Sequence, residues 1–338
     1  MTLHTLLSAA CIALFQTCSV AQDVQARAEA LLQHARQLSD IRSARSPAFR
    51  LKATFSFIGD DLQTVHGTYT EVWVSNSQWH RETAIGDLRH IEVGGVGKHW
   101  TLFPDGFPQQ VDKLSALLAI FPPVWSKFDF TSVNERSTAG LSGDCAYTKP
   151  VMLDLQASFC FEKNSGLFLE EASPKRRLQN IVRYSCGFRT FRKFGDHLFP
   201  RDLYCFEDRH KTMTVVVDDL SLESSPDPAL FVSPSGAAEI GECSGKSVPP
   251  TQTKWGIMMP DPDHILGHVP LIKVWFVVDT KGEPQNIKVM NFAHKGTVDD
   301  LLKIIQTWRY NPGTCDGKST PMVVSPEVPA LLPRLQPH

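Results

Sequence analysis

The spacing of apolar residues changes from helical to strand-like early in the sequence. Between Val24 and Leu38 apolar residues recur every three or four positions, with charged and amide side chains between them. This spacing places the apolar side chains on one face of an amphipathic helix. From Phe49 to Phe57 every second residue is apolar instead, which predicts a half-buried antiparallel strand.

Similar short runs continue as far as Leu222, separated by glycine or polar turns such as Gly94-Gly95. They predict an antiparallel β-meander. One short helix is expected at Lys113–Ile120, where the Phe-Pro-Pro sequence that follows stops it. The other strands of the meander are expected at residues 67–74, 78–84, 88–93, 98–102, 145–148, 158–161, 167–170, 179–184, 188–194, 202–207 and 212–222.

A second folded region is predicted after residues 232–250, a stretch rich in Ser, Gly, Pro and Ala. Such a composition is typical of a linker. We therefore expect a β-rich domain at residues 22–231 and a smaller domain at residues 251–338. The smaller domain has a β-β-α-β order, with its elements expected at residues 271–278, 286–291, 298–308 and 321–328.

Residues 1–21 have the layout of a secretory signal peptide. The apolar run Leu6–Phe15 is too short to span a bilayer as a helix, which takes roughly 20 residues. Ser19 and Ala21 place small residues at the −3 and −1 positions of a cleavage site. The first five residues depart from the usual pattern, because they contain no Lys or Arg. We expect export to the periplasm and cleavage after Ala21.

The mature chain is not expected to be held in a membrane. A lipid anchor through Cys18 would need small residues before it, and Phe15, Gln16 and Thr17 do not fit that pattern. No later apolar stretch approaches the length of a membrane-spanning helix.

Six cysteines follow the predicted signal peptide, and an even number in an exported protein indicates disulfides. Six cysteines allow 15 pairings, so their number alone does not choose among them. Zinc is not expected, because no two cysteines have the C-x2-C to C-x4-C spacing. Local strand geometry favours the pairs Cys145–Cys160, Cys186–Cys205 and Cys243–Cys315.

The smaller domain carries two short motifs. Asp279 and Gly282 form a D-x-x-G turn, and Trp308-Arg309-Tyr310-Asn311-Pro312 follows the predicted helix, with Gly317 beyond it. With these motifs, residues 254–328 resemble the C-terminal domain of TonB. We expect Trp308 to seal the helix against the sheet, and Pro312 to end the helix because it lacks an N–H donor.

The resemblance to TonB implies a fold and a mode of recognition. An exposed edge strand near Pro321–Val328 would pair with an extended peptide of an envelope protein by β-augmentation. It does not imply coupling to the proton-motive force, because the sequence shows neither an uncleaved anchor nor a long Pro-rich spacer.

The first domain resembles the LolA/LppX-like group of lipoprotein carriers. The segments that carry the resemblance are Gly67–Trp73, Phe199-Pro200-Arg201 and Asp227–Phe231. The fold class implied is mainly β with α+β: a curved antiparallel half-barrel with a packed helix, followed by the small β-β-α-β domain. Members of the group hold a lipid or acyl chain, which implies an apolar cavity.

Four aromatic residues are the candidates to line such a cavity. Tyr69 and Trp73 share a face of one predicted strand, and Trp79 and Trp100 lie on nearby strands. The alternative is that these rings form ordinary core beneath the helix at Val24–Leu38.

We find no catalytic motif or cofactor motif, and only one weak candidate for a metal site. The G-x-S-x-G and G-x-G-x-x-G sequences are absent. His264 and His268, with Asp261 and Asp263 nearby, form a weak metal candidate, since Pro260 and Pro262 interrupt a helix that would align them. The net charge is −2, from 34 basic and 36 acidic residues without a basic block, which argues against nucleic-acid binding.

Three functions remain open from the sequence. The first is an exported, non-enzymatic protein that binds an apolar ligand or lipidated partner. The second is a structural envelope protein with a filled core and no ligand. The third is a hydrolase whose site lies in the long loops. The sequence names neither the ligand nor the oligomeric state.

Overall fold

The computed structural model describes residues 22–59, 62–121, 128–138, 140–152, 154–177, 180–243, 245–254, 271–290 and 295–329. The predicted signal peptide lies outside the described residues, and so do His264 and His268 with their aspartates. The chain divides into two compact units. The first unit is Met1–Ile41, Phe55–Phe57 and Lys113–Asp218, and the second is Arg42–Thr54, Ile58–Asp112 and Asp219–His338.

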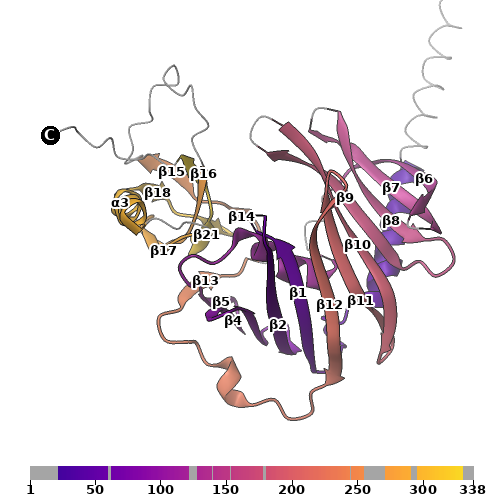
Figure 1. Cartoon of the computed structure of the whole chain (residues 1–338), viewed down its shortest axis with the longest axis horizontal. Helices are drawn as coiled ribbons and strands as arrows, with labels where there is room; N and C mark the ends of the chain where they lie inside the picture. Colours follow the sequence, from indigo (N-terminus) through magenta and orange to yellow (C-terminus); the bar gives the residue numbers. More distant parts are fainter. Residues whose placement is uncertain are drawn as a thin grey trace, which may run out of the picture. The chain divides into compact units, whose positions relative to one another are not determined.

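The fold is mainly β, as predicted, with a large curved antiparallel sheet and few helices (Figure 1). In the described part of the chain this sheet has 13 strands, in the order β13-β5-β4-β3-β2-β1-β12-β11-β10-β9-β8-β7-β6. Their bounds are β1 Phe49–Ile58, β2 Thr64–Ser75, β3 Gln78–Ile85, β4 Leu88–Gly95, β5 Lys98–Leu102, β6 Phe130–Thr138, β7 Leu141–Met152, β8 Leu155–Glu162, β9 Phe168–Arg177, β10 Asn180–Phe194, β11 His197–Glu207, β12 His210–Leu222 and β13 Ala238–Gly241.

The predicted strands are confirmed, with three differences. β6 was not expected, since its sequence contains a run of polar residues, and it pairs with β7 at the end of the sheet. Residues 179–184 and 188–194 were expected as two strands. The described part of this stretch, residues 180–194, forms one strand, β10, which pairs with β9 and β11 on its two sides. β13 lies inside the predicted linker and pairs with β5. The predicted domain limits themselves stay a prediction.

The predicted N-terminal helix is confirmed at residues 22–39, and it packs on the sheet of the first unit (Figure 1). Ala28 and Ala35 on its apolar face are fully buried. Gln25 fixes its first turns, because its side chain donates to the carbonyl of Phe128 at 3.2 Å and accepts from the N–H of Phe130 at 2.8 Å.

Phenylalanine rings fill the core of the first unit. Phe168 contacts Phe161, Phe188 and Phe121, with ring centroids 5.0 to 5.8 Å apart. All four side chains are buried. The predicted short helix is confirmed as α2 Asp112–Ala119, which the 3-10 turn η1 Gln109–Val111 precedes.

Three disulfides join the cysteines in the pairs that strand geometry favours. Cys145 lies directly opposite Cys160 on β7 and β8, and Cys186 lies opposite Cys205 on β10 and β11. Both disulfides therefore link neighbouring strands inside regular ladders. The bond between Cys243 and Cys315 closes a much longer loop, with a sequence separation of 72.

The second unit contains a small sheet with the predicted β-β-α-β order, but the last predicted strand, residues 321–328, is replaced by two short strands, β21 Met322–Val324 and β22 Glu327–Pro329. Its central strand is β16 Leu271–Val278, which pairs with β17 Pro284–Val289 on one side and with β21 and β22 on the other. Helix α3 Lys295–Gln306 covers the sheet, and Trp308 is fully buried beside Phe276, as expected. The remaining short elements are η3 Pro228–Phe231, β14 Ser247–Val248, β15 Thr251–Lys254, β18 Arg309–Asn311, β19 Thr314–Cys315 and β20 Lys318–Ser319.

The two motifs of this sheet meet through their backbones. The Asp279 carboxylate closes the D-x-x-G turn by accepting from the N–H groups of Lys281 and Glu283, both at 2.9 Å. The N–H of Tyr310 donates to the carbonyl of Gly282 at 2.9 Å. A Cβ on Gly282 would lie 1.9 Å from the Tyr310 carbonyl oxygen, so only glycine permits this approach.

The expected role of Pro312 is wrong. Helix α3 ends at Gln306, and the residues after Trp308 form strand β18, which pairs with β15. The Arg309 guanidinium donates to the carbonyls of Gln306 and Trp308, at 3.0 and 2.7 Å, and so helps to end the helix. Pro312 follows β18 instead, and Gly317 has a φ of 80° in the turn between β19 and β20.

Candidate functional site

The structure brings three of the four candidate aromatic residues onto one face of the second unit. In the pairing of β2 with β3, Trp73 lies opposite Trp79, and Tyr69 lies on the same face of β2, four residues before Trp73. All three are buried. Trp100 lies opposite Val93, on the other face of the sheet, and is half-buried. The alternation of period two predicted the shared face of Tyr69 and Trp73, but not the position of Trp79 on the same face.

A buried charge cluster lies between these rings, and it was not predicted from the sequence. The Glu71 side chain is fully buried. It accepts from the Arg81 Nε at 3.0 Å and from two nitrogens of Arg42, the Nε at 3.0 Å and the Nη2 at closer range. The Tyr69 hydroxyl donates to the same carboxylate at 3.3 Å. We call Arg42, Tyr69, Glu71 and Arg81 the buried charge cluster.

The two guanidinium groups decide the charge of Glu71. Burial by itself would raise the pKa of this carboxyl, but Arg42 and Arg81 outweigh the burial and lower its pKa to about 2. Burial raises the pKa of the Tyr69 hydroxyl, and the Glu71 carboxylate beside it acts in the same direction. Glu71 is therefore ionised and Tyr69 is neutral at physiological pH.

The cluster also packs the aromatic face. The Arg81 guanidinium lies 4.2 Å from the Trp79 ring centroid, and the Phe49 ring stacks on Trp73 at 5.5 Å. Arg42 in turn lies over Phe49 at 5.5 Å. Each guanidinium group thus lies over one ring of this face, an arrangement that cation–π attraction stabilises. A signal was present in the sequence, because Glu71 and Arg81 each lie at an inward position of their strand.

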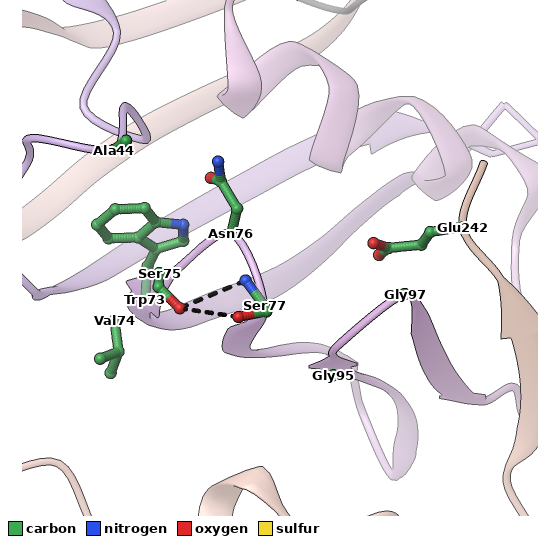
Figure 2. A pocket seen from close by; sticks show the side chains of 9 residues that line it. All are labelled: Ala44, Trp73, Val74, Ser75, Asn76, Ser77, Gly95, Gly97 and Glu242. Atoms are coloured by element: carbon green, nitrogen blue, oxygen red, sulfur yellow. Dashed lines mark hydrogen bonds between the residues drawn. The ribbon is translucent and has the colours of Figure 1, made fainter. Parts of the chain in front are cut away.

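A hollow of about 450 Å³ lies at one end of this sheet, where the hairpins turn (Figure 2). Trp73 lies on one side, Glu242 lies across from it, and Asn76 extends between them from the β2–β3 turn. The Ser75 hydroxyl fixes the turn by accepting from the Ser77 N–H at 3.3 Å. The lining residues are Ala44, Trp73, Val74, Ser75, Asn76, Ser77, Gly95, Gly97 and Glu242. We call this the turn hollow.

The first unit contains a second hollow, between the helix at residues 22–39 and the start of β6. Its volume is about 260 Å³. Its lining residues are Gln25, Glu29, Leu32, Gln33, Arg36, Phe128 and Phe130. We call it the helix slot. The sequence predicted the helix and its packing on the sheet, but not Phe128 and Phe130, because they lie in a region where no strand was expected.

An unusual carboxyl lies on the sheet face that the helix slot adjoins. Glu171 on β9 lies directly opposite Phe159 on β8, and Phe159 contacts the rings of Phe128 and Phe130. Burial raises the pKa of Glu171 to about 7. The phenylalanine-lined face of the first unit therefore carries one carboxyl that exchanges its proton near neutral pH.

The described residues show neither a metal cluster nor a membrane-spanning helix. No group of three or more His, Cys, Asp or Glu in the described ranges is placed to hold a metal ion. Among the helices that the structure describes, none has the length and apolar character needed to cross a bilayer.

Comparison with known proteins gives structural likeness only. No family model matches the sequence, and no curated protein matches it. A domain described as an outer membrane lipoprotein-sorting protein, from Vibrio parahaemolyticus, is 9% identical, with a TM-score of 0.39 over 60% of this chain and 94% of its own. A LolA superfamily protein from Nitrosomonas europaea is 9% identical, with a TM-score of 0.40 over 61% of this chain and 97% of its own.

A third solved structure is a DUF1329 family protein from Desulfovibrio piger. It is 11% identical, with a TM-score of 0.42 over 63% of this chain and 96% of its own. Two of these three names refer to the group that the first domain resembles in sequence, and none refers to TonB. At such TM-scores the likeness carries no argument about function.

Proposed function

We propose that this chain is an exported, non-enzymatic binding protein whose first unit holds an apolar chain in the helix slot. The ligand is a lipid or the acyl chain of a lipidated partner. The single observation that carries the proposal is the lining of the slot, where Leu32, Phe128 and Phe130 surround a space of about 260 Å³. Small-molecule sites are mostly apolar with a few polar groups that fix orientation.

The polar residues of the slot are placed for such a ligand. Glu29, Gln33 and Arg36 are exposed residues of the helix, so they face water and suit a polar head group. Gln25 is the exception, because it is bonded to the backbone of Phe128 and Phe130 and holds these two rings beside the helix. An acyl chain would lie against the rings with its head toward Arg36.

The small sheet of the second unit supports a second mode of binding, the pairing of an extended peptide with an edge strand. β21 is at one end of the strand order, and Val323 on it is an exposed apolar residue. The carbonyl of Pro321 already accepts from the N–H of Gly241 at 2.9 Å. The edge proposed for pairing is therefore Met322–Val324 and the β22 segment after it, a shorter edge than the sequence suggested.

The helix slot offers a matched pair of variants. Leu31 and Leu32 are adjacent half-buried leucines of the same helix, but only Leu32 lines the slot. Leu32→Trp fills part of the space, and Leu31→Trp adds the same bulk elsewhere. We expect Leu32→Trp to weaken the binding of a fluorescent fatty acid by about tenfold or more, since one buried leucine-sized contact is worth roughly 1.5–3 kcal/mol. Leu31→Trp should bind within about twofold of the parent chain.

Two outcomes would contradict the proposal. One is equal binding by the two tryptophan variants. The other is a purified chain that carries no lipid in native mass spectrometry and takes up no fatty acid. Either outcome favours the alternative, a structural envelope protein with a filled core.

A further inference from the structure

We propose that the turn hollow of the second unit binds a small organic cation, a primary ammonium or guanidinium group on a short aliphatic stem. This inference is independent of the helix slot, since it concerns other residues and another ligand chemistry. The volume of the turn hollow, about 450 Å³, lies within the roughly 300–1,000 Å³ typical of small-molecule sites.

The charge of the residues that line the turn hollow favours a positively charged ligand. Among the nine residues that line the hollow, Glu242 is the only one with a full charge. Its carboxylate faces the hollow from the side opposite Trp73 (Figure 2). The His99 ring lies beside this carboxylate, with its Nδ1 3.5 Å from the Glu242 Oε1. An ammonium group in the hollow would complete an ion pair with this carboxylate.

The other polar groups that line the turn hollow can accept hydrogen bonds from a ligand that donates them. The Ser75 hydroxyl oxygen and the Ser77 hydroxyl lie 3.4 Å apart in the β2–β3 turn, and the Asn76 side chain extends from the same turn. Hydroxyl and amide oxygens accept hydrogen bonds, and an ammonium group has three N–H donors to give. Trp73 and Val74 form the apolar wall against which the methylene stem would pack.

The frame that holds Glu242 is fixed before any ligand arrives. The N–H of Glu242 donates to the carbonyl of Gly97 at 3.1 Å, and the N–H of Gly241 donates to the carbonyl of Pro321 at 2.9 Å. The next residue, Cys243, is bonded to Cys315. The carboxylate is thus held from a backbone anchored on both sides, which lowers the cost of ordering it on binding.

The test uses the full chain and two probes that differ only in charge. Nα-acetyl-lysine amide carries the ammonium, and Nα-acetyl-norleucine amide has a similar stem without it. Binding is followed by the NMR shifts of the backbone amides of Asn76, Ser77 and Gly97. We expect the lysine probe to bind with a millimolar Kd, which corresponds to about −4 kcal/mol. The norleucine probe should bind at least about tenfold more weakly.

Glu242→Gln and Glu239→Gln are matched variants for the same titration. Both carboxylates are partly exposed and close in sequence, but Glu239 is paired with Lys98 and does not line the hollow. Glu242→Gln should weaken the lysine probe about tenfold, since hydrogen bonds to charged groups exceed neutral ones in strength, and Glu239→Gln should leave it within about twofold. Equal binding of the two probes, or an unchanged Kd in Glu242→Gln, would overturn the proposal.

Discussion

The buried charge cluster makes a strong prediction about stability. In Glu71→Gln the guanidinium groups of Arg42 and Arg81, whose side chains are only 12% and 21% exposed, lose the carboxylate that they share. Removing one partner of a buried ion pair typically costs 3–5 kcal/mol, because the remaining charge is uncompensated. We therefore expect Glu71→Gln to lower the free energy of unfolding at pH 7 by about 3 kcal/mol or more.

The stabilisation by the ionised Glu71 carboxylate can also be measured from the pH dependence of the unfolding free energy. The folded pKa of Glu71 is lowered from 4.5 to about 2. A carboxyl with a lowered folded pKa stabilises the folded state above its unfolded pKa, and this stabilisation is lost as the pH falls through the folded pKa. The difference between the two pKa values corresponds to about 3 kcal/mol, lost between about pH 4.5 and pH 2.

Urea denaturation of the parent chain and the variant at pH 7, 4 and 2.5 measures both effects. The gap in unfolding free energy between them should be widest at pH 7 and should shrink toward pH 2.5. Glu82→Gln is the control, since Glu82 lies on the same strand as Arg81 and forms a partly exposed ion pair with Arg89. Such a pair is worth about 1 kcal/mol or less. The reasoning is refuted if Glu71→Gln costs no more than Glu82→Gln, or if its gap is the same at every pH.

Two further predictions concern the second unit and the disulfides, both measured by urea denaturation. Gly282 and Gly317 have φ values of 82° and 80°, so both alanine variants meet the same backbone cost of about 1 kcal/mol. Gly282→Ala should cost about 2 kcal/mol more, because its Cβ would meet the Tyr310 carbonyl while that of Gly317 meets nothing. A serine pair at Cys243 and Cys315 should cost about 4 kcal/mol, and one at Cys145 and Cys160 about 3, since their sequence separations are 72 and 15. An equal loss of unfolding free energy in the two glycine variants would contradict the first argument, and an equal loss in the two serine pairs would contradict the second.

The fold could be predicted in large part because most strands are buried on one face. An alternation such as that of Phe49–Phe57 specifies both the strand and the side that it buries. β6 was not predicted because it lacks this alternation. Its middle residues are exposed and polar, so its sequence shows no period of two. The β18 strand was assigned to the helix end because Trp308 continues the helical spacing of α3, and only the pairing of β18 with β15 shows where the helix ends.

The candidate site was harder to predict, because a period identifies a face but not what the face contacts. Tyr69 and Trp73 share a face as expected, and Trp79 lies on that face too. Their neighbours include Arg42, which comes from the segment before β1. A contact between residues this far apart in sequence leaves no local pattern. The helix slot is similar, since Leu32 meets Phe128 and Phe130 only after folding.

The two hollows differ in a way that makes their proposed ligands separable. In the helix slot the charged residues Glu29 and Arg36 are of opposite sign and exposed, so they cancel over a short distance and leave the apolar rings to dominate binding. In the turn hollow Glu242 has no cation among the lining residues to balance it. Salt screens interactions between exposed charges over about 8–10 Å. Raising the ionic strength should therefore weaken a cation in the turn hollow while leaving an acyl chain in the helix slot nearly unaffected.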